Sequence, residues 1–253
     1  MHKNKPDWTK LITPEMAEVV AHIRQWNEEH PATSNYLQDY MDERVFWNDG
    51  GPIPAKVIEV EIEGPYGKIP CRLHYPRISD QPMGMMLYAH GGSLYLGNND
   101  THSRIMRTLT EKSDTVVIGV DYHLAPQNRF PKWIEECVAA TKYFRAHAAE
   151  YGLDANDVSF AGDSAGAWLS MATMLWLRDE DPDISYVTSL LLYYGLYGMY
   201  DSPTQRLYGN EIDGMMREYD EKLYPASIMD EKDVKSPHCD LLYDDRNAGS
   251  MYS

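Results

Sequence analysis

The chain has few cysteines and lacks any apolar run that would cross a membrane. Its three cysteines, Cys71, Cys137 and Cys239, are odd in number and lack the spacing of a zinc site. This pattern does not indicate a disulfide framework and favours the reducing cytoplasm. The most apolar short stretch, residues 190–194, is far below the roughly 20 residues of a membrane helix. No apolar segment near the start has the form of a secretory signal. We therefore expect a cytoplasmic protein.

Positive charge is also scarce. Only 23 Lys and Arg stand against 39 Asp and Glu, which gives a formal net charge of −16. Because phosphate recognition needs basic patches, this balance argues against nucleic acids and anionic membranes as partners. The 253 residues, 43% of them hydrophobic, suffice for one large domain with a buried core. We expect a single α/β domain over residues 1–253.

Hydrophobic periodicity predicts an α/β organisation. Residues 13–48 have helical spacing, and the alternating segments 57–62 and 69–75, joined by a glycine turn, predict an antiparallel hairpin. After residue 83, apolar strands alternate with helices, which predicts a parallel sheet with crossover helices. The expected strands are 85–89, 115–120, 157–161 and 187–194, and the expected helices are 101–112, 131–149 and 168–178. Two further helical stretches, 204–218 and 219–224, predict a helical insertion over the sheet.

The sequence G-D-S-A-G at residues 162–166 follows an expected strand and precedes an expected helix, which is the context of a nucleophile elbow. The turn is so sharp that side chains two positions before and after Ser164 would collide, which explains Gly162 and Gly166. Ser164 would stand at a helix N-terminus, where the N–H of Ala165 and the helix dipole favour an oxyanion. The motif predicts a serine hydrolase.

A second glycine motif predicts an oxyanion hole. His90, Gly91, Gly92 and Ser93 follow the expected strand 85–89. Glycines after a strand let the backbone approach a ligand and direct N–H groups at it. A glycine pair after a strand is more often a simple turn, but an α/β-hydrolase takes one oxyanion donor from such a loop and another from the residue after the nucleophile. The two motifs in this order therefore predict one site.

A third motif carries a family resemblance. Asp121-Tyr122-His123-Leu124-Ala125-Pro126 follows the expected strand 115–120 and is followed by Arg-Phe-Pro at 129–131. Together with the two glycine motifs, it resembles the hormone-sensitive-lipase-like branch of the α/β-hydrolases. Residues 175–179 and 194–198 are similar to those of bacterial acetyl esterases. The resemblance extends to about residue 245.

The resemblance implies a serine esterase that acts on short acyl chains and needs no metal or organic cofactor. It implies an α/β-hydrolase fold, a mostly parallel sheet flanked by helices with a helical cap. Ser164 matches the nucleophile, and Gly92, Ser93 and Ala165 match the oxyanion donors. His90 matches a histidine that orients the oxyanion loop. The expected divisions are cap helices at 1–50, the core sheet at 51–198, a cap insertion at 199–236 and a tail at 237–253.

The sequence departs from the family at two places. Ser93 stands where the family usually has a third glycine, which adds a Cβ where φ is expected to be unusual. The triad runs in the order Ser, Asp or Glu, His, yet only His238 follows Ser164. The family's last two strands, which present the triad acid and base, have no counterpart here. We expect a truncated tail, and a sheet edge whose exposure would favour self-association.

Two readings of the function stay open at this stage. The first is an ester hydrolase that forms an acyl-Ser164 intermediate. The alternative is a catalytically impaired, truncated homologue that keeps the pocket and binds small esters or a protein partner. An acyl transferase is a third class of function. It is less favoured, because a transferase must exclude water from the acyl-enzyme and no feature of the sequence indicates this.

Several neighbouring side chains have weaker signals. His238 and His123 are expected to be structural rather than catalytic. Tyr122, Asp163 and Tyr197 are candidates for a substrate pocket. Asp163 has a second interpretation, because the residue before the nucleophile points away from the serine hydroxyl and is expected to hydrogen-bond the surrounding loops.

Overall fold

The computed structural model describes residues 10–181, 183–198, 229–230 and 232–242. The helices predicted at 204–218 and 219–224 lie outside the described residues, as does most of the predicted cap insertion. The chain forms two compact units, Met1–Phe46 and Trp47–Ser253. The boundary lies close to the predicted end of the N-terminal helices at residue 50, but the single-domain organisation and its divisions stay predictions.

The N-terminal unit contains two helices where the sequence predicted one helical span. Helix α1 (Pro14–Glu29) is capped by Thr13, whose hydroxyl accepts a hydrogen bond from the Met16 N–H at 3.3 Å. Helix α2 comprises Tyr36–Asn48. Between them, the Thr33 N–H and hydroxyl both donate to Asp39, each at 2.7 Å. These side-chain bonds satisfy a local turn, so the helix is interrupted where periodicity alone predicts continuity.

The larger unit contains a six-stranded mixed sheet in the order β1-β2-β4-β3-β5-β6. Its strands are β1 (Lys56–Gly64), β2 (Gly67–Tyr75), β3 (Met83–Ala89), β4 (Val116–Val120), β5 (Leu153–Asp163) and β6 (Val187–Tyr193). Strands β1 and β2 form the predicted antiparallel hairpin, and β2 is also antiparallel to β4. The pairs β3–β4, β3–β5 and β5–β6 are parallel, as predicted. The prediction of a mostly parallel α/β-hydrolase sheet is confirmed.

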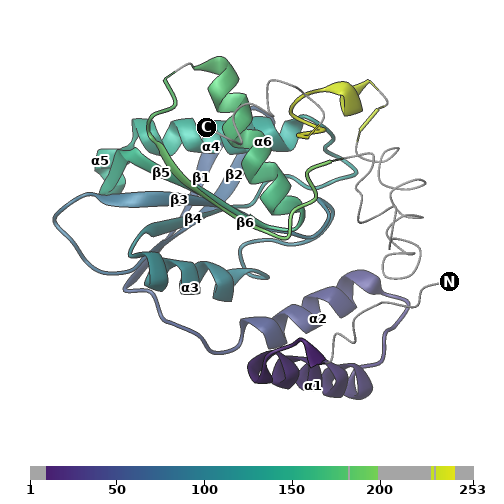
Figure 1. Cartoon of the computed structure of the whole chain (residues 1–253). Helices are drawn as coiled ribbons and strands as arrows, with labels where there is room; N and C mark the ends of the chain where they lie inside the picture. Colours follow the sequence, from purple (N-terminus) through teal and green to yellow (C-terminus); the bar gives the residue numbers. More distant parts are fainter. Residues whose placement is uncertain (1–9, 182, 199–228, 231, 243–253) are drawn as a thin grey trace. The chain divides into compact units, whose positions relative to one another are not determined.

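Helices cover both faces of this sheet (Figure 1). Helix α3 (Ser103–Ser113) lies on one face, and α4 (Lys132–Ala146), α5 (Ala148–Tyr151) and α6 (Ala165–Glu180) lie on the other. Alternate residues of β3 serve the two faces: Met86 and Tyr88 pack with Met106 of α3, whereas Met85 and Leu87 belong to the main core. The predicted helix 131–149 is divided at His147, where α4 ends and α5 begins.

The segment after β6 returns to helix α6. The Leu241 N–H donates to the Tyr197 carbonyl at 2.9 Å, and the Trp168 indole N–H donates to the Cys239 carbonyl at 2.9 Å. All three cysteines are buried and free. Within the described part of the chain, β6 is an outer strand, but self-association through it stays a prediction. No described helix is both long and apolar enough to cross a membrane.

Candidate active site

Ser164 stands on a strained turn between β5 and α6. Its backbone has φ 52° and ψ −121°, a combination that side-chain-bearing residues rarely adopt. Its N–H donates to the Tyr193 carbonyl at the end of β6, at 2.9 Å. A Cβ on Gly162 would lie 2.4 Å from the backbone of Gly166, so the steric reason predicted for the flanking glycines is confirmed. The turn has the form of a nucleophile elbow.

The H-G-G-S loop lies beside this turn because of the register of the sheet. Ala89, the last residue of β3, pairs with Gly162 of the parallel strand β5. The carboxyl ends of the two strands therefore meet at one edge of the sheet, where loops carry function in α/β folds. Gly166 touches this loop so closely that a Cβ there would lie 2.0 Å from the Ala89 carbonyl oxygen and 2.6 Å from that of His90. The structure thus brings the two predicted motifs together.

The backbone N–H groups near Ser164 differ in whether they already donate a hydrogen bond within the protein. The Gly91 N–H donates to the Asp163 carboxylate at 2.9 Å, so this donor is occupied. Among the described residues, the N–H groups of Gly92 and Ser93 have no acceptor. Ala165 is the first residue of α6, whose first N–H groups lack intrahelical partners. These three N–H groups are the donors implied by the resemblance, and their role in an oxyanion hole stays a prediction.

Ser93 has the unusual backbone conformation expected from its sequence position. Its φ is 54°, that of Leu94 is 67° and that of Gly92 is 115°. The left-handed region costs a residue with a side chain roughly 1–2 kcal/mol, whereas glycine adopts it freely. The serine therefore keeps its backbone N–H in the loop at the expense of local strain.

Replacing Ser93 with glycine is expected to stabilise the protein. Relief of the positive φ outweighs the greater freedom of glycine in the unfolded chain, so the free energy of unfolding should rise by up to about 1 kcal/mol. Urea denaturation measures this difference in the free energy of unfolding. Leu94→Gly serves as a comparison, because it relieves the neighbouring positive φ but also removes a buried side chain. A Ser93→Gly protein less stable than the wild type would contradict the expectation.

His90 is buried and acts on the loop rather than on a substrate. Its Nδ1 lies 2.8 Å from the Gly91 carbonyl oxygen, and its ring stacks on Tyr122 with centroids 4.4 Å apart. Burial lowers the pKa of His90 to about 3, so the ring is neutral and Nδ1 carries the proton donated to Gly91. Tyr122 is also buried, and its hydroxyl donates to the His90 carbonyl at 2.7 Å. Both side chains support the position of the loop.

Asp163 is turned toward the loops, as the second of its two interpretations predicted. Its side chain is buried, and it accepts hydrogen bonds from the Tyr88 hydroxyl at 2.6 Å and the Gly91 N–H at 2.9 Å. These contacts favour the loop-binding interpretation over a place in a substrate pocket. Tyr197 is half-buried, and its place in a pocket stays a prediction.

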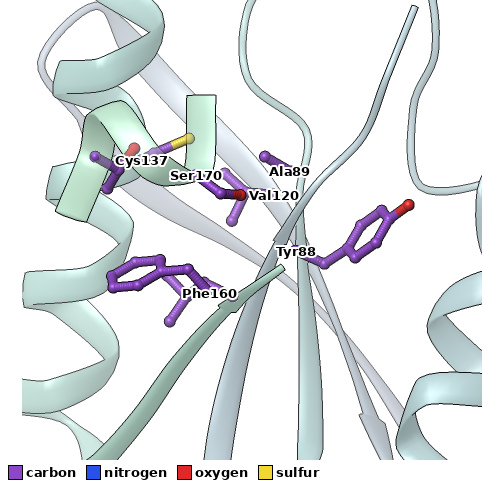
Figure 2. A pocket seen from close by; sticks show the side chains of 8 residues that line it. Tyr88, Ala89, Val120, Cys137, Phe160 and Ser170 are labelled. Atoms are coloured by element: carbon purple, nitrogen blue, oxygen red, sulfur yellow. The ribbon is translucent and has the colours of Figure 1, made fainter. Parts of the chain in front are cut away.

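The sheet contains a small cavity that is separate from these residues (Figure 2). It lies between β3, β4 and β5 and the helices α4 and α6, and its volume is about 10 Å³. This volume has room for about one water molecule and is far below that of a small-molecule site. Its lining residues are Leu87, Tyr88, Ala89, Val120, Cys137, Phe160, Ser170 and Thr173. None of the predicted site residues lines it, so it is not a substrate pocket for Ser164.

The histidines predicted to be structural have other partners. His238 Nε2 lies 3.0 Å from the Asp179 carboxylate, near the far end of α6. Asp179 is about 15 residues from Ser164 along this helix, or roughly 22 Å at 1.5 Å per residue. His123 Nδ1 lies 2.5 Å from the buried carboxylate of Glu136. Within the described residues, no histidine is hydrogen-bonded to Ser164, and no cluster of three metal-binding side chains occurs.

Sequence reasoning missed three side chains that surround Asp163. Besides Tyr88, they are His102, at the N-terminus of α3, and Tyr194, directly after β6. In the sequence, Tyr88 and Tyr194 have the pattern of ordinary residues of expected strands, and His102 that of an ordinary residue of an expected helix. Their convergence results from the order of the strands, which brings β5 between β3 and β6. No local pattern in the sequence signals this contact.

Asp121, in the third motif, holds the loop that leads to α3. The Asn99 N–H donates to its carboxylate at 2.6 Å. Burial raises the pKa of Asp121 to about 6, although this hydrogen bond and the charge of Arg72 oppose the change. The folded protein therefore binds a proton at this carboxyl more tightly than the unfolded chain does.

This shift predicts a pH dependence of stability. Because the folded-state pKa is raised, the contribution of Asp121 is fully present below about pH 4 and is lost as the pH rises through 6. The difference between the usual pKa of an aspartate and a pKa of about 6 corresponds to about 2–3 kcal/mol of stability. Asp121→Asn, which stays neutral, should remove this loss between pH 4 and pH 7 in urea denaturation. An unchanged difference between the two pH values would contradict the expectation.

Comparisons with known proteins agree with this fold. A family model described as an alpha/beta hydrolase fold matches residues 86–251. The chain is 43% identical over 208 residues to an acetyl esterase of Salmonella typhi and 44% identical to that of Salmonella schwarzengrund. These matches cover 82% of the chain but only 64% of each relative. The chain thus spans less than two thirds of their length.

Solved structures show the same fold. A thermophilic carboxylesterase from a metagenomic library superimposes with a TM-score of 0.75 at 25% identity, over 85% of this chain and 74% of that protein. A hyperthermophilic esterase from the archaeon Pyrobaculum calidifontis superimposes with a TM-score of 0.76 at 23% identity, over 92% and 75%.

Proposed function

The chain belongs to the α/β-hydrolase family, and we propose from this premise that it hydrolyses carboxylic esters of short acyl chains through an acyl-Ser164 intermediate. The observation that carries this proposal is the elbow itself. Ser164 is held at φ 52° beside a loop whose Gly92 and Ser93 N–H groups have no acceptor among the described residues. The similarity to acetyl esterases supports an acetyl ester as the substrate class.

The chemistry follows from these groups. Ser164 Oγ attacks the carbonyl carbon, and the N–H groups of Gly92, Ser93 and Ala165 stabilise the oxyanion that forms. The bond to the alcohol then breaks, and the serine proton leaves with the alcohol. Water attacks the acyl-serine in the second step and releases the acid. Among the described residues, no histidine is hydrogen-bonded to Ser164, and His238 and His123 contact Asp179 and Glu136 instead, so these contacts assign no histidine to the transfer of these protons.

That last observation favours a second candidate function. A protein with the elbow and the loop but without a base would bind small esters and turn them over poorly, because an unactivated serine is a weak nucleophile.

A cytoplasmic location and the absence of nucleic-acid and membrane partners belong to the proposal in either form, since both rest on composition.

Turnover of nitrophenyl esters by the purified, folded chain separates the two candidates. We expect release of nitrophenol from 4-nitrophenyl acetate above a heat-denatured control, with lower kcat/KM for longer acyl chains. A folded chain that releases none would overturn the proposed hydrolysis. Binding of the ester, measured by calorimetry in the absence of turnover, would then establish the second candidate.

A further inference from the structure

We propose that the buried carboxylate of Asp163 is a positioning residue that fixes the oxyanion loop against the nucleophile elbow. His102, Tyr88 and Tyr194 hold this carboxylate in turn. The inference rests on the function proposed for Ser164, and it assigns a specific task to the residue that precedes the nucleophile.

The contacts of Asp163 join the end of β5 to three other segments of the chain, residues 88–91, His102 and Tyr194. Its Oδ1 accepts from the Tyr88 hydroxyl on β3 at 2.6 Å and from the Gly91 N–H in the oxyanion loop at 2.9 Å. Its Oδ2 accepts from the Tyr194 hydroxyl after β6 at 3.2 Å and lies 3.5 Å from His102 Nε2 at the start of α3. One carboxylate therefore ties together the loops that surround the end of β5.

The packing at Gly91 shows that the carboxylate defines where the loop can run. A Cβ on Gly91 would lie 2.4 Å from Asp163 Oδ2 and 2.8 Å from the Asp163 carbonyl oxygen. The loop backbone thus rests directly on this residue. Gly91 immediately precedes Gly92 and Ser93, so a displacement of Gly91 would move the N–H groups proposed to hold the oxyanion.

The charge of Asp163 strengthens this attachment. Asp163 is 7% exposed, and a buried carboxylate without partners would be strongly destabilising. Burial alone would raise its pKa, but the contacts with His102, Tyr88 and Gly91 together hold the pKa below its usual value. The side chain therefore stays ionised at neutral pH. Hydrogen bonds to an ionised acceptor are stronger than neutral ones, which suits a group that must hold a backbone in place.

Asp163 is kept away from the substrate by the same geometry. Its side chain is directed to Tyr88 and His102, which lie on the face of the sheet that α3 covers. It therefore acts through Gly91 rather than on reacting atoms. A change at Asp163 should lower kcat more than it changes KM, because the affected N–H groups stabilise the oxyanion of the transition state.

Asp163→Asn tests this role, since asparagine keeps the shape and removes the charge. We expect amide hydrogen exchange of the loop 90–93 to become at least about tenfold faster. We also expect kcat for 4-nitrophenyl acetate to fall by roughly 10- to 100-fold, with KM within about threefold, as for a displaced oxyanion donor. Asp157→Asn is the matched control, because Asp157 lies on the same strand and is exposed.

The outcomes separate this inference from the proposed function. Faster exchange in the loop of Asp163→Asn, with a wild type that releases no nitrophenol, would support the positioning role and overturn hydrolysis. Loop exchange equal to that of Asp157→Asn, with kcat unchanged or KM alone altered, would overturn the positioning role.

If Asp163→Asn does not fold, Tyr88→Phe removes one donor to the carboxylate and keeps the charge. Unchanged loop exchange in that variant would overturn the inference in the same way.

Discussion

Replacing Ser164 with alanine is expected to reduce hydrolysis of 4-nitrophenyl acetate to the rate of a denatured control. No acyl intermediate can form without the serine hydroxyl, and loss of a catalytic serine lowers kcat by roughly a million-fold. The alanine keeps the Cβ at φ 52°, so the free energy of unfolding should stay within about 1 kcal/mol of the wild type. Initial rates and urea denaturation of the two proteins measure both quantities.

Ser164→Gly is the matched control for this change. It also removes the nucleophile, but glycine adopts φ 52° without strain, so this variant should be inactive and about 1 kcal/mol more stable than Ser164→Ala. Turnover by Ser164→Ala at the wild-type rate would show that hydrolysis does not pass through an acyl-serine.

Gly166→Ala is expected to cost at least about 3 kcal/mol of stability. The new Cβ would lie 2.0 Å from the Ala89 carbonyl oxygen and 2.6 Å from that of His90, so α6 must move away from β3. Overpacking of a buried contact typically costs about 1–3 kcal/mol. The cost of Gly166→Ala should lie at or above the upper end of this range, because the new Cβ meets two backbone carbonyl groups that cannot move aside easily. The same movement separates Ser164 from the oxyanion loop, and activity should fall with stability.

Gly84→Ala, on strand β3, is the comparison for Gly166→Ala on α6. Its new Cβ would lie 2.4 Å from Oδ2 of Asp157, which is the end of a flexible, exposed side chain that can move. Urea denaturation should therefore show a much smaller loss for Gly84→Ala than for Gly166→Ala. Equal losses in the two variants would mean that the close approach of α6 to β3 is not specifically required.

The parts of the fold that depend on local pattern were predictable from the sequence. Alternation gave the hairpin of β1 and β2, and the glycines at 162 and 166 follow from the steric demands of one turn. Helix boundaries were less predictable. The span 13–48 is interrupted because Thr33 and Asp39 form a local turn, and hydrophobic periodicity does not register such side-chain bonds.

The site could be predicted only as far as its motifs reach. The G-D-S-A-G motif around Ser164 and the H-G-G-S loop are each a continuous stretch of sequence, so each could be recognised by itself. The parallel pairing of β3 with β5 brings the two motifs together. The partners of Asp163 were not predictable, because His102 and Tyr194 meet it only through the strand order of the sheet. The strain at Ser93 was predictable from the family's preference for glycine at that position, and its φ of 54° agrees.

Labelling with a fluorophosphonate, followed by peptide mass mapping, tests most directly whether Ser164 is an activated nucleophile beside an oxyanion hole. The reagent phosphonylates a serine only when the hydroxyl is accessible and its developing oxyanion is stabilised. We predict one adduct, on Ser164, formed by the native chain, absent after heat denaturation and slowed in Asp163→Asn. A native, folded chain that forms no adduct, or forms it at another residue, would contradict the assignment of this turn as a catalytic site.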